Sequence, residues 1–453
     1  MKKLFVATDD VILDKKFVYW SLLTIFCLYL QFVPYVNYFL VVAIFVFTIV
    51  SFYKRWPSGL IPILVLSFLH GDQSVSLYTL KISGVSLFYI LILSVFTLKV
   101  FTRRKISRIE LFIIIFFCIY FSYSILNSNY IETTYFVNDT LFFLIGILFL
   151  FSIYDIKKFN IEKMFFAISL GYFFSKVLVY STGLGLQVTA YSSDIDQYSA
   201  IFDPIENLLL IFNLQSLLFP KNKTVRALSF LNLSIFGLSA YLLGYMHGAT
   251  IVLVIIVLFY ALLRNIKLLL VISFSCFLLI FVSFNVDINS ILNVQEDSVF
   301  LFKIQKVLGL FDFLYNSNIS IYDLPRSTQV RLIETANLLV QNPFYLIFGN
   351  GFGGFLTETI YFYGDYLNSD DYSLDQITSG KFQLLHAYNQ IILKHGLLSI
   401  LIAFCCFWKF RRAEERNFRD TALIFLVLSY SFTIKPYLIL ALLVFSLKPK
   451  EHN

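Results

Sequence analysis

Long apolar runs follow one another through most of this chain of 453 residues. The runs are uniformly apolar, and they lack the alternation over about ten residues that marks the strands of a membrane barrel. Hydrophobic residues form 58% of the chain and charged residues 14%, which leaves too little polar surface for a soluble domain of this length. The sequence therefore predicts an all-α, polytopic membrane protein, because helices satisfy their own backbone hydrogen bonds within lipid.

We expect about 14 membrane spans. They cover residues 17–36, 38–53, 58–70, 85–101, 109–126, 139–154, 164–180, 203–219, 227–243, 249–263, 268–284, 386–408, 421–434 and 437–447. The first run is too long for the apolar core of a cleavable signal peptide, and no small-residue cleavage site follows it. It should therefore remain as the first span.

Positively charged residues set the orientation of these spans. Lysines lie at and before the start of the first span, and clusters such as Lys54 with Arg55, or Arg411 with Arg412, occupy every second loop. Because cytoplasmic loops carry an excess of Lys and Arg, both termini should be cytoplasmic. The net charge of +7 then reflects topology, and no nucleic-acid partner is expected.

This topology divides one integrated domain into three parts. Residues 1–285 hold spans 1 to 11, residues 286–385 form a large loop, and residues 386–453 hold spans 12 to 14 with a cytoplasmic tail. The loop is the longest hydrophilic stretch, and the charge pattern places it outside the cytoplasm. This location excludes ATP and nucleotide sugars as direct donors for any chemistry in the loop.

Metal and disulfide chemistry are not expected. The five cysteines all fall within predicted spans. The His, Asp and Glu residues show no spacing typical of a metal site. We therefore predict no metal, no cofactor and no disulfide in the loop.

The large loop contains two arginines, Arg326 and Arg331, at the start of a short amphipathic run. Apolar residues recur there at helical spacing until Pro343, which predicts a helix that ends before the proline. The planar guanidinium group suits a diphosphate ligand. Pairing with a nearby carboxylate such as Glu334, or with lipid headgroups, is the alternative.

A glycine cluster, with Gly349, Gly351 and Gly353, follows this helix. Glycines allow the backbone to approach a ligand closely and to present N–H groups to an anion. A tight turn after the helix is an equally good interpretation. The cluster does not indicate a dinucleotide site, because no strand–helix unit surrounds it.

His386 stands where the chain is expected to re-enter the membrane, and Asn389 follows about one helical turn later. An imidazole at a membrane surface can accept a proton from a sugar hydroxyl at neutral pH. A histidine that caps the helix locally is the alternative.

Three further residues are candidates outside the loop. Lys176 and Glu206 are ionisable groups within predicted spans, where they either line a cavity or form a structural pair. His247 lies at a short outward turn, where it either joins the site or caps a helix.

The arrangement resembles the O-antigen polymerase and O-antigen ligase superfamily of bacterial envelope glycosyltransferases. The resemblance rests first on many spans with cytoplasmic termini and one long outward loop late in the chain. Within that loop come a helix opened by Arg331, then Asn342 and Pro343 ahead of the glycine cluster, then His386 at the loop exit before an apolar helix with Gly396.

Two positions depart from the family pattern. The family often has Asn or Ser directly after the loop histidine, whereas Ala387 stands here and Asn389 comes later. Many relatives also carry an Arg-Gly pair near the start of an earlier span, where this chain has His247 and Gly248.

The resemblance implies an enzyme of the bacterial inner membrane that needs neither metal nor cofactor. Its substrates would be oligosaccharide repeat units on undecaprenyl diphosphate, joined at the periplasmic face. A chain-length regulator and a flippase in the same membrane would be partners.

The resemblance also implies roles for the candidate residues. Arg331, with Arg326 as second choice, would bind the diphosphate leaving group, and His386 would act as general base or orient the acceptor. The substrate-binding group would comprise Gly349, Gly351, Gly353, Asn389, His247, Lys176 and Glu206. Direct displacement would invert the anomeric centre.

Three other functions compete with this polymerase. An O-antigen ligase would transfer the glycan to lipid A-core. A flippase for lipid-linked oligosaccharide can also have about 14 spans, but it should keep its polar residues along a central pathway and have short loops. A non-catalytic assembly scaffold would not need Arg331 or His386 for glycan synthesis.

Overall fold

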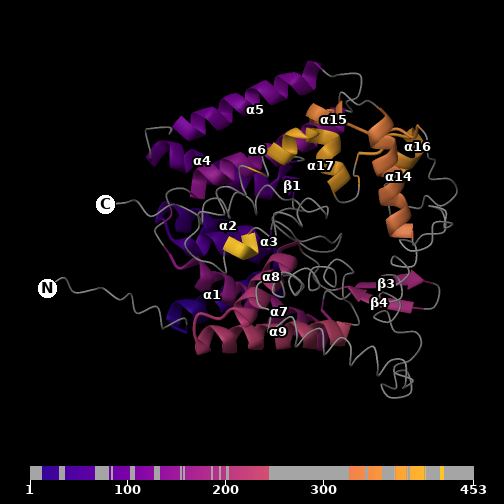
Figure 1. The fold of residues 1–453 in the computed structure, drawn as a ribbon. Helices are drawn as coiled ribbons and strands as arrows, with labels where there is room; N and C mark the ends of the chain where they lie inside the picture. The colour runs from indigo at the N-terminus through magenta and orange to yellow at the C-terminus, as the bar shows by residue number, and fades with distance from the viewer. Residues whose placement is uncertain are drawn as a thin grey trace, which may run out of the picture. The chain divides into compact units, whose positions relative to one another are not determined.

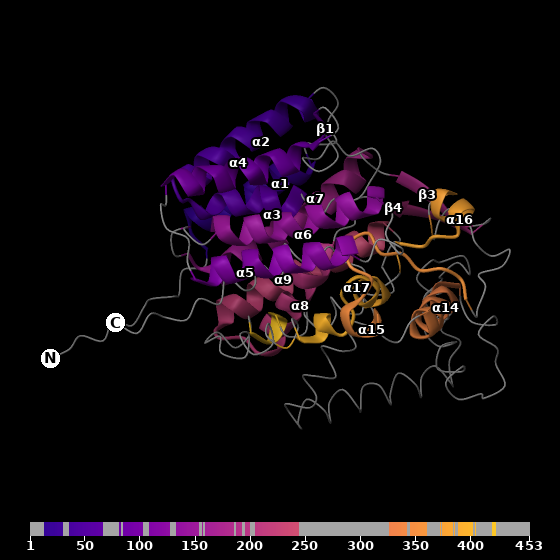
Figure 2. The same ribbon diagram turned by 90° about the horizontal axis from the view of Figure 1, so that it is seen from above.

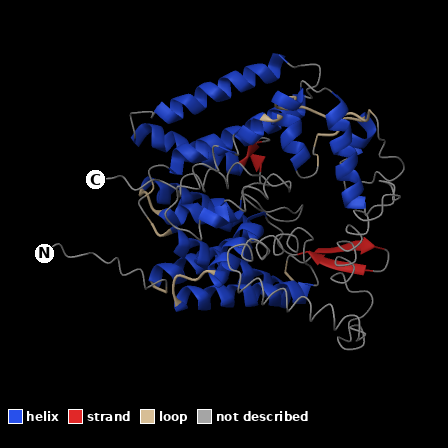
Figure 3. Cartoon of the chain, viewed as in Figure 1, coloured by secondary structure: helices blue, strands red, loops and turns tan. Residues whose placement is uncertain are grey.

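The computed structural model describes residues 13–29, 36–66, 81–82, 85–102, 108–126, 133–153, 156, 159–184, 187–192, 195–199, 204–243, 326–341, 345–359, 372, 374–383, 385, 388–401, 404 and 419–422. This part of the chain is mostly helical, with two antiparallel pairs of short strands (Figure 3). The predicted helical class is confirmed.

The chain divides into two compact units, each built from two stretches of sequence. Unit 1 comprises Met1–Phe88 and Lys157–Gln305, and unit 2 comprises Tyr89–Ile156 and Lys306–Asn453. The expected boundaries at residues 285 and 386 lie outside the described residues. Helices of the predicted loop thus share unit 2 with helices from the first half of the chain.

Six α-helices of unit 1 are described, with one 3-10 turn and two hairpins. They are α1 (Lys15–Tyr29), α2 (Val36–Tyr53), η2 (Pro57–Gly59), α3 (Leu60–Leu66), β1 (Lys81–Ile82), β2 (Val85–Ser86), α7 (Ile161–Thr182), β3 (Gln187–Ser192), β4 (Ile195–Ser199), α8 (Pro204–Leu218) and α9 (Lys223–Leu243). α7 packs against α1, α8 and α9 (Figure 1).

The ends of α7 follow ordinary capping rules. The side chain of Asn160 accepts a hydrogen bond from the backbone N–H of Lys163 at 2.9 Å, which satisfies one of the free donors at the start of the helix. Gly183 ends the helix with a left-handed φ of 69°, a conformation that glycine adopts without steric cost. Gly171 lies between them, and a Cβ there would lie 2.6 Å from the carbonyl oxygen of Ser21 in α1. These residues fix the length of α7 and its close approach to α1.

A polar ladder runs through the interior of unit 1. Glu162, Ser169 and Lys176 are spaced seven residues apart on α7. Lys221 pairs with Glu162 at 2.7 Å, Asn213 donates to Ser169 Oγ at 2.8 Å, and Glu206 pairs with Lys176. Seven residues make about two helical turns, so the rungs lie on one face and set the antiparallel register of α7 against α8 and the turn after it.

Seven helices are described within unit 2 or at its start. They are α4 (Leu87–Thr102), α5 (Arg108–Leu126), α6 (Thr133–Ile153), α14 (Arg326–Gln341), α15 (Tyr345–Phe348), α16 (Leu374–Ser379) and α17 (Tyr388–His395). α5 and α6 lie side by side (Figure 2). α17 packs against both α14 and α15.

Two helix ends in unit 2 can be compared with the sequence. α14 ends at Gln341, two residues before Pro343, as the pattern predicts. The helix expected over residues 386–408 is interrupted instead: α17 ends at His395, Gly396 has a φ of 56°, and helical turns resume only at residues 398–401. The break leaves carbonyl groups at the end of α17 without partners in their own helix.

Two of the described helices have the length and composition of membrane spans. Tyr135–Ser152 and Ile161–Thr182 are long and apolar enough to cross a membrane, and Phe39–Tyr53, Leu87–Thr102, Ile114–Leu126 and Ile205–Leu218 are shorter apolar helices. Large apolar side chains are exposed on α2 and α5, among them Phe39, Val42 and Phe112. The predicted number of spans stays a prediction, since whole spans lie outside the described residues.

Candidate functional site

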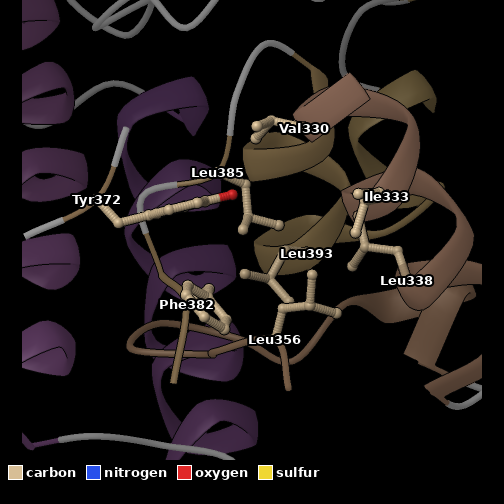
Figure 4. Packing of buried hydrophobic residues seen from close by; sticks show 8 residues of the cluster. All are labelled: Val330, Ile333, Leu338, Leu356, Tyr372, Phe382, Leu385 and Leu393. Atoms are coloured by element: carbon tan, nitrogen blue, oxygen red, sulfur yellow. The ribbon is translucent and has the colours of Figure 1, made fainter. Parts of the chain in front are cut away.

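Segments of the predicted loop come together in unit 2 around an apolar cluster. Val330, Ile333 and Leu338 of α14 pack with Leu393 of α17, and Leu356, Tyr372, Phe382 and Leu385 complete the cluster (Figure 4). Leu356 and Phe382 also exchange backbone hydrogen bonds of 2.7 and 2.8 Å. Burial of this cluster holds the helix that carries Arg331 against the helix that follows the loop.

Asn389 forms the polar connection between these two helices. Its amide donates to a carboxylate oxygen of Glu334 at 2.9 Å and to the backbone carbonyl of Arg331 at 3.0 Å. Its side-chain oxygen accepts from the hydroxyl of Thr335 at 3.1 Å. Tyr372 donates to the other oxygen of Glu334, which is 0% exposed. Asn389 therefore fixes the first turn of α17 against the turn of α14 that begins at Arg331.

The glycine segment, residues 349–354, follows α15 and lies against α5, α6 and α17. Gly349, Gly351 and Gly353 have φ values of 71°, 85° and 76°, which residues with a Cβ rarely adopt. A Cβ on Gly349 would lie 2.3 Å from the backbone of Lys394, and one on Gly353 would lie 2.6 Å from the backbone N of Phe136. The expected close backbone approach is present, and its partners here are other parts of the protein.

The N–H groups of residues 350–354 already have partners. Asn350 and Gly351 donate to the carbonyl groups of Leu393 and Lys394 at 2.6 and 3.0 Å. These carbonyls lie in the last turn of α17, so the glycine segment caps the helix end that the break at Gly396 leaves open.

The next donors of the glycine segment reach the apolar helices α5 and α6. Phe352 N–H donates to Ser124 Oγ at 3.0 Å, and Gly353 N–H donates to Asp139 Oδ2 at 2.8 Å. The anion that meets the Gly353 donor is thus a side chain of the protein.

Asp139, on α6, collects three donors from separate segments. Besides Gly353 N–H, it accepts from Gln383 Nε2 at 3.3 Å and forms a buried ion pair with Lys394 of α17. We call these four residues the Asp139 cluster. It connects α6, the glycine segment, the strand-like segment before α17, and the end of α17 itself.

An aromatic pair extends this network to α5. The hydroxyl of Tyr120 donates to the carbonyl of Lys394, and it lies 2.9 Å from Nδ1 of His395. Tyr123 donates to the carbonyl of Gly349 at 2.8 Å. The Tyr120 hydroxyl thus uses its hydrogen to donate to a carbonyl, and its oxygen remains able to accept a hydrogen bond. Nδ1 of His395 is placed to donate to this oxygen.

The predicted site residues do not all lie in one place. Arg331, Asn389 and the three glycines lie in one network in unit 2, and Arg326 is the first residue of α14. The side chain of Arg326 and the residues His386 and His247 lie outside the described residues, so their predicted roles stay predictions.

Lys176 and Glu206 belong to unit 1. Both are buried, they form an ion pair with each other, and Tyr172 also donates to Glu206 at 3.4 Å. This contact favours the structural-pair interpretation over cavity lining.

The sequence interpretation missed Asp139, Lys394 and Tyr120 and gave Glu334 only a pairing role. A charged residue within an apolar run is costly unless it has a partner, so Asp139 and Lys394 could have been found by that criterion. Glu334 stands three residues after Arg331 on the same helix, a spacing that brings side chains to one face. Which residue partners which could not be read from the spacing alone.

Within the described ranges, no three His, Cys, Asp or Glu side chains gather in a way that could hold a metal ion. Comparisons with protein-family models, with curated proteins and with solved structures find no match to this chain.

Proposed function

We propose that this chain is an O-antigen or related surface polysaccharide polymerase. It is a glycosyltransferase of the bacterial inner membrane, with about 14 spans and a large periplasmic loop. It joins oligosaccharide repeat units carried on undecaprenyl diphosphate, without a metal. A chain-length regulator and a flippase in the same membrane are its partners.

One observation carries the proposal. The helix with Arg331, the glycine segment and the helix after the loop are the elements on which the resemblance to this superfamily rests. In unit 2 these elements are in contact: Asn389 bonds the carbonyl of Arg331, and the glycine segment caps α17. If these elements had no common role, nothing would require them to form hydrogen bonds with one another.

The apolar helices support the membrane part of the proposal. The helix Tyr135–Ser152 contains Asp139 and has the length and composition of a span. Exposed apolar side chains on α5, including Leu111, Ile115 and Ile119, form a surface that lipid would cover at no cost.

The chemistry is a displacement at the anomeric carbon. An acceptor hydroxyl forms the new C–O bond while the bond from that carbon to the diphosphate oxygen breaks. The guanidinium of Arg331 stabilises the departing diphosphate, which carries away the bonding electrons. His386 takes the hydroxyl proton or orients the acceptor. Attack from the opposite face inverts the anomeric configuration.

The other candidates differ in what they predict for cells. We test them by deleting the gene and separating lipopolysaccharide by gel electrophoresis. Loss of the ladder with a single repeat still attached to core supports the polymerase. Loss of all attached O-antigen while lipid-linked polymer accumulates indicates a ligase, and failure of lipid-linked units to cross the membrane indicates a flippase.

A matched pair of variants tests the site itself. Arg331→Ala should abolish the ladder at normal abundance of the protein, because the leaving group loses its cation. Arg226→Ala, which removes an exposed arginine at the start of α9, should leave the ladder intact. An intact ladder with Arg331→Ala would support a scaffold instead of an enzyme.

A further inference from the structure

Two buried carboxylates hold the two ends of α17. At its start, Asn389 donates to Glu334 of α14 at 2.9 Å. At its end, Lys394 pairs with Asp139 of α6. Glu334 is 0% and Asp139 is 9% exposed, so neither carboxylate relies on water for its hydrogen bonds. A helix of only eight residues has little stability of its own, and these contacts decide where it lies.

The donors around Asp139 make its position specific. They are one backbone N–H, one amide and one ammonium group, from Gly353, Gln383 and Lys394. A buried carboxylate that loses its partners is strongly unfavourable. The arrangement in which all three segments meet α6 is therefore favoured over any arrangement in which one of them has moved away.

The segments that meet at Asp139 have little regular structure to fix them. The glycine segment is neither helix nor strand, and the chain breaks its helix at Gly396, two residues after Lys394. Irregular backbone at membrane depth is tolerated only where its polar groups find partners within the protein. The Asp139 cluster provides such partners, and it thereby sets the geometry of the residues around α17.

We propose that Asp139 and Lys394 are positioning residues of the transferase: their ion pair fixes α17 on α6, and α17 in turn fixes the Arg331 turn of α14 through Asn389. The inference rests on the proposed function and deepens it. It connects a membrane helix to the helix that binds the diphosphate. Neither residue touches the substrate.

The test uses the full chain in phospholipid vesicles, with repeat units on undecaprenyl diphosphate isolated from the deletion strain as the probe. Replacing both charges, with Asp139→Asn and Lys394→Met, leaves no unpaired buried charge, so the protein should accumulate. The value of kcat should fall about 100-fold because the misplaced Arg331 no longer meets the charge that builds up on the departing diphosphate, while KM for the donor rises by much less.

A second ion pair, in which the carboxylate of Glu162 is buried and the lysine is exposed, provides the control. Glu162→Gln with Lys221→Met removes an ion pair of 2.7 Å from unit 1, and kcat should then equal that of the wild type at equal abundance. Lys394→Arg keeps the charge and should lose only about tenfold in kcat, which is partial rescue relative to the neutral pair. If the neutral pair does not accumulate, Lys394→Arg carries the test.

The outcomes separate the two proposals. A neutral pair, or Lys394→Arg, that transfers at the wild-type rate overturns the positioning role and leaves the proposed function intact. A wild-type protein that does not extend the glycan overturns the proposed function, and the positioning role fails with it.

Discussion

Each unit contains a buried ion pair between a lysine and a carboxylate, but the surroundings of the two pairs differ. In unit 1, Lys176 and Glu206 connect the regular helices α7 and α8, with a hydroxyl of Tyr172 nearby. In unit 2, Asp139 pairs with Lys394 and also accepts hydrogen bonds from a backbone N–H and an amide.

The difference follows from what each pair has to hold. Regular helices already satisfy their backbone groups, so the pair in unit 1 needs only to set register, as the neighbouring rungs of the polar ladder do. In unit 2, backbone N–H groups of the glycine segment instead find partners in other elements, at the end of α17 and on α5 and α6. There the Asp139 carboxylate accepts a backbone hydrogen bond, from Gly353, that a regular helix or strand would otherwise satisfy.

The largest expected effect comes from removing one lysine. Lys394→Met leaves Asp139 buried without a countercharge and should lower the free energy of unfolding by about 3–5 kcal/mol. Lys176→Met should do the same in unit 1. Adding Glu206→Gln should recover most of this loss, whereas adding Asp139→Asn should recover less, because the donors of Gly353 and Gln383 then meet a neutral group. Thermal unfolding in detergent measures the stability of the single and double variants of each pair. Equal recovery by the second substitution in the two units would contradict the comparison.

Two glycines with similar backbone angles should respond differently to alanine. Gly353→Ala places a Cβ 2.6 Å from a backbone atom of Phe136, and it also forces an alanine into a left-handed backbone conformation. Together these two effects should cost about 2–4 kcal/mol. In unit 1, Gly183 also has a left-handed φ of 69°, but no atom lies within 4 Å of the position that a Cβ would take. Gly183→Ala should therefore cost only about 1–2 kcal/mol. The same unfolding measurement compares them. A Gly353→Ala variant as stable as Gly183→Ala would mean that the glycine segment is not packed as described.

The smallest of these effects separates two buried asparagines. Asn389→Ala removes a donor from the Glu334 carboxylate and should cost about 1.5–3 kcal/mol. Asn213→Ala in unit 1 removes neutral hydrogen bonds to Ser169 and to the Leu209 carbonyl, and one from Asn232, and should cost about 1 kcal/mol. Equal losses would show that the charge on Glu334 does not strengthen the connection between α14 and α17.

Much of the fold follows from the sequence, because apolar runs and helix stops act locally. The end of α14 before Pro343 needed only the proline and the helical spacing ahead of it. The break at Gly396 was missed, since an isolated glycine within an apolar run does not tell whether the helix continues.

The site was predicted in part for a similar reason. Arg331, Asn389 and the glycines have recognisable residue types and order. The partners of the glycines were not predictable, because Asp139 and Ser124 come from helices more than 200 residues away in the chain. Such contacts depend on tertiary packing, and no periodicity in the sequence records them.

The most direct test of the central claim is transfer by the purified protein. Wild type and Arg331→Ala are reconstituted at equal abundance with repeat units on undecaprenyl diphosphate, in the presence of EDTA and without nucleotides. Mass spectrometry then measures the glycan products and the released undecaprenyl diphosphate. The account predicts longer glycans and one released carrier for each new bond with the wild type, and neither with Arg331→Ala. No product from the wild type, or equal product from both proteins, would contradict it.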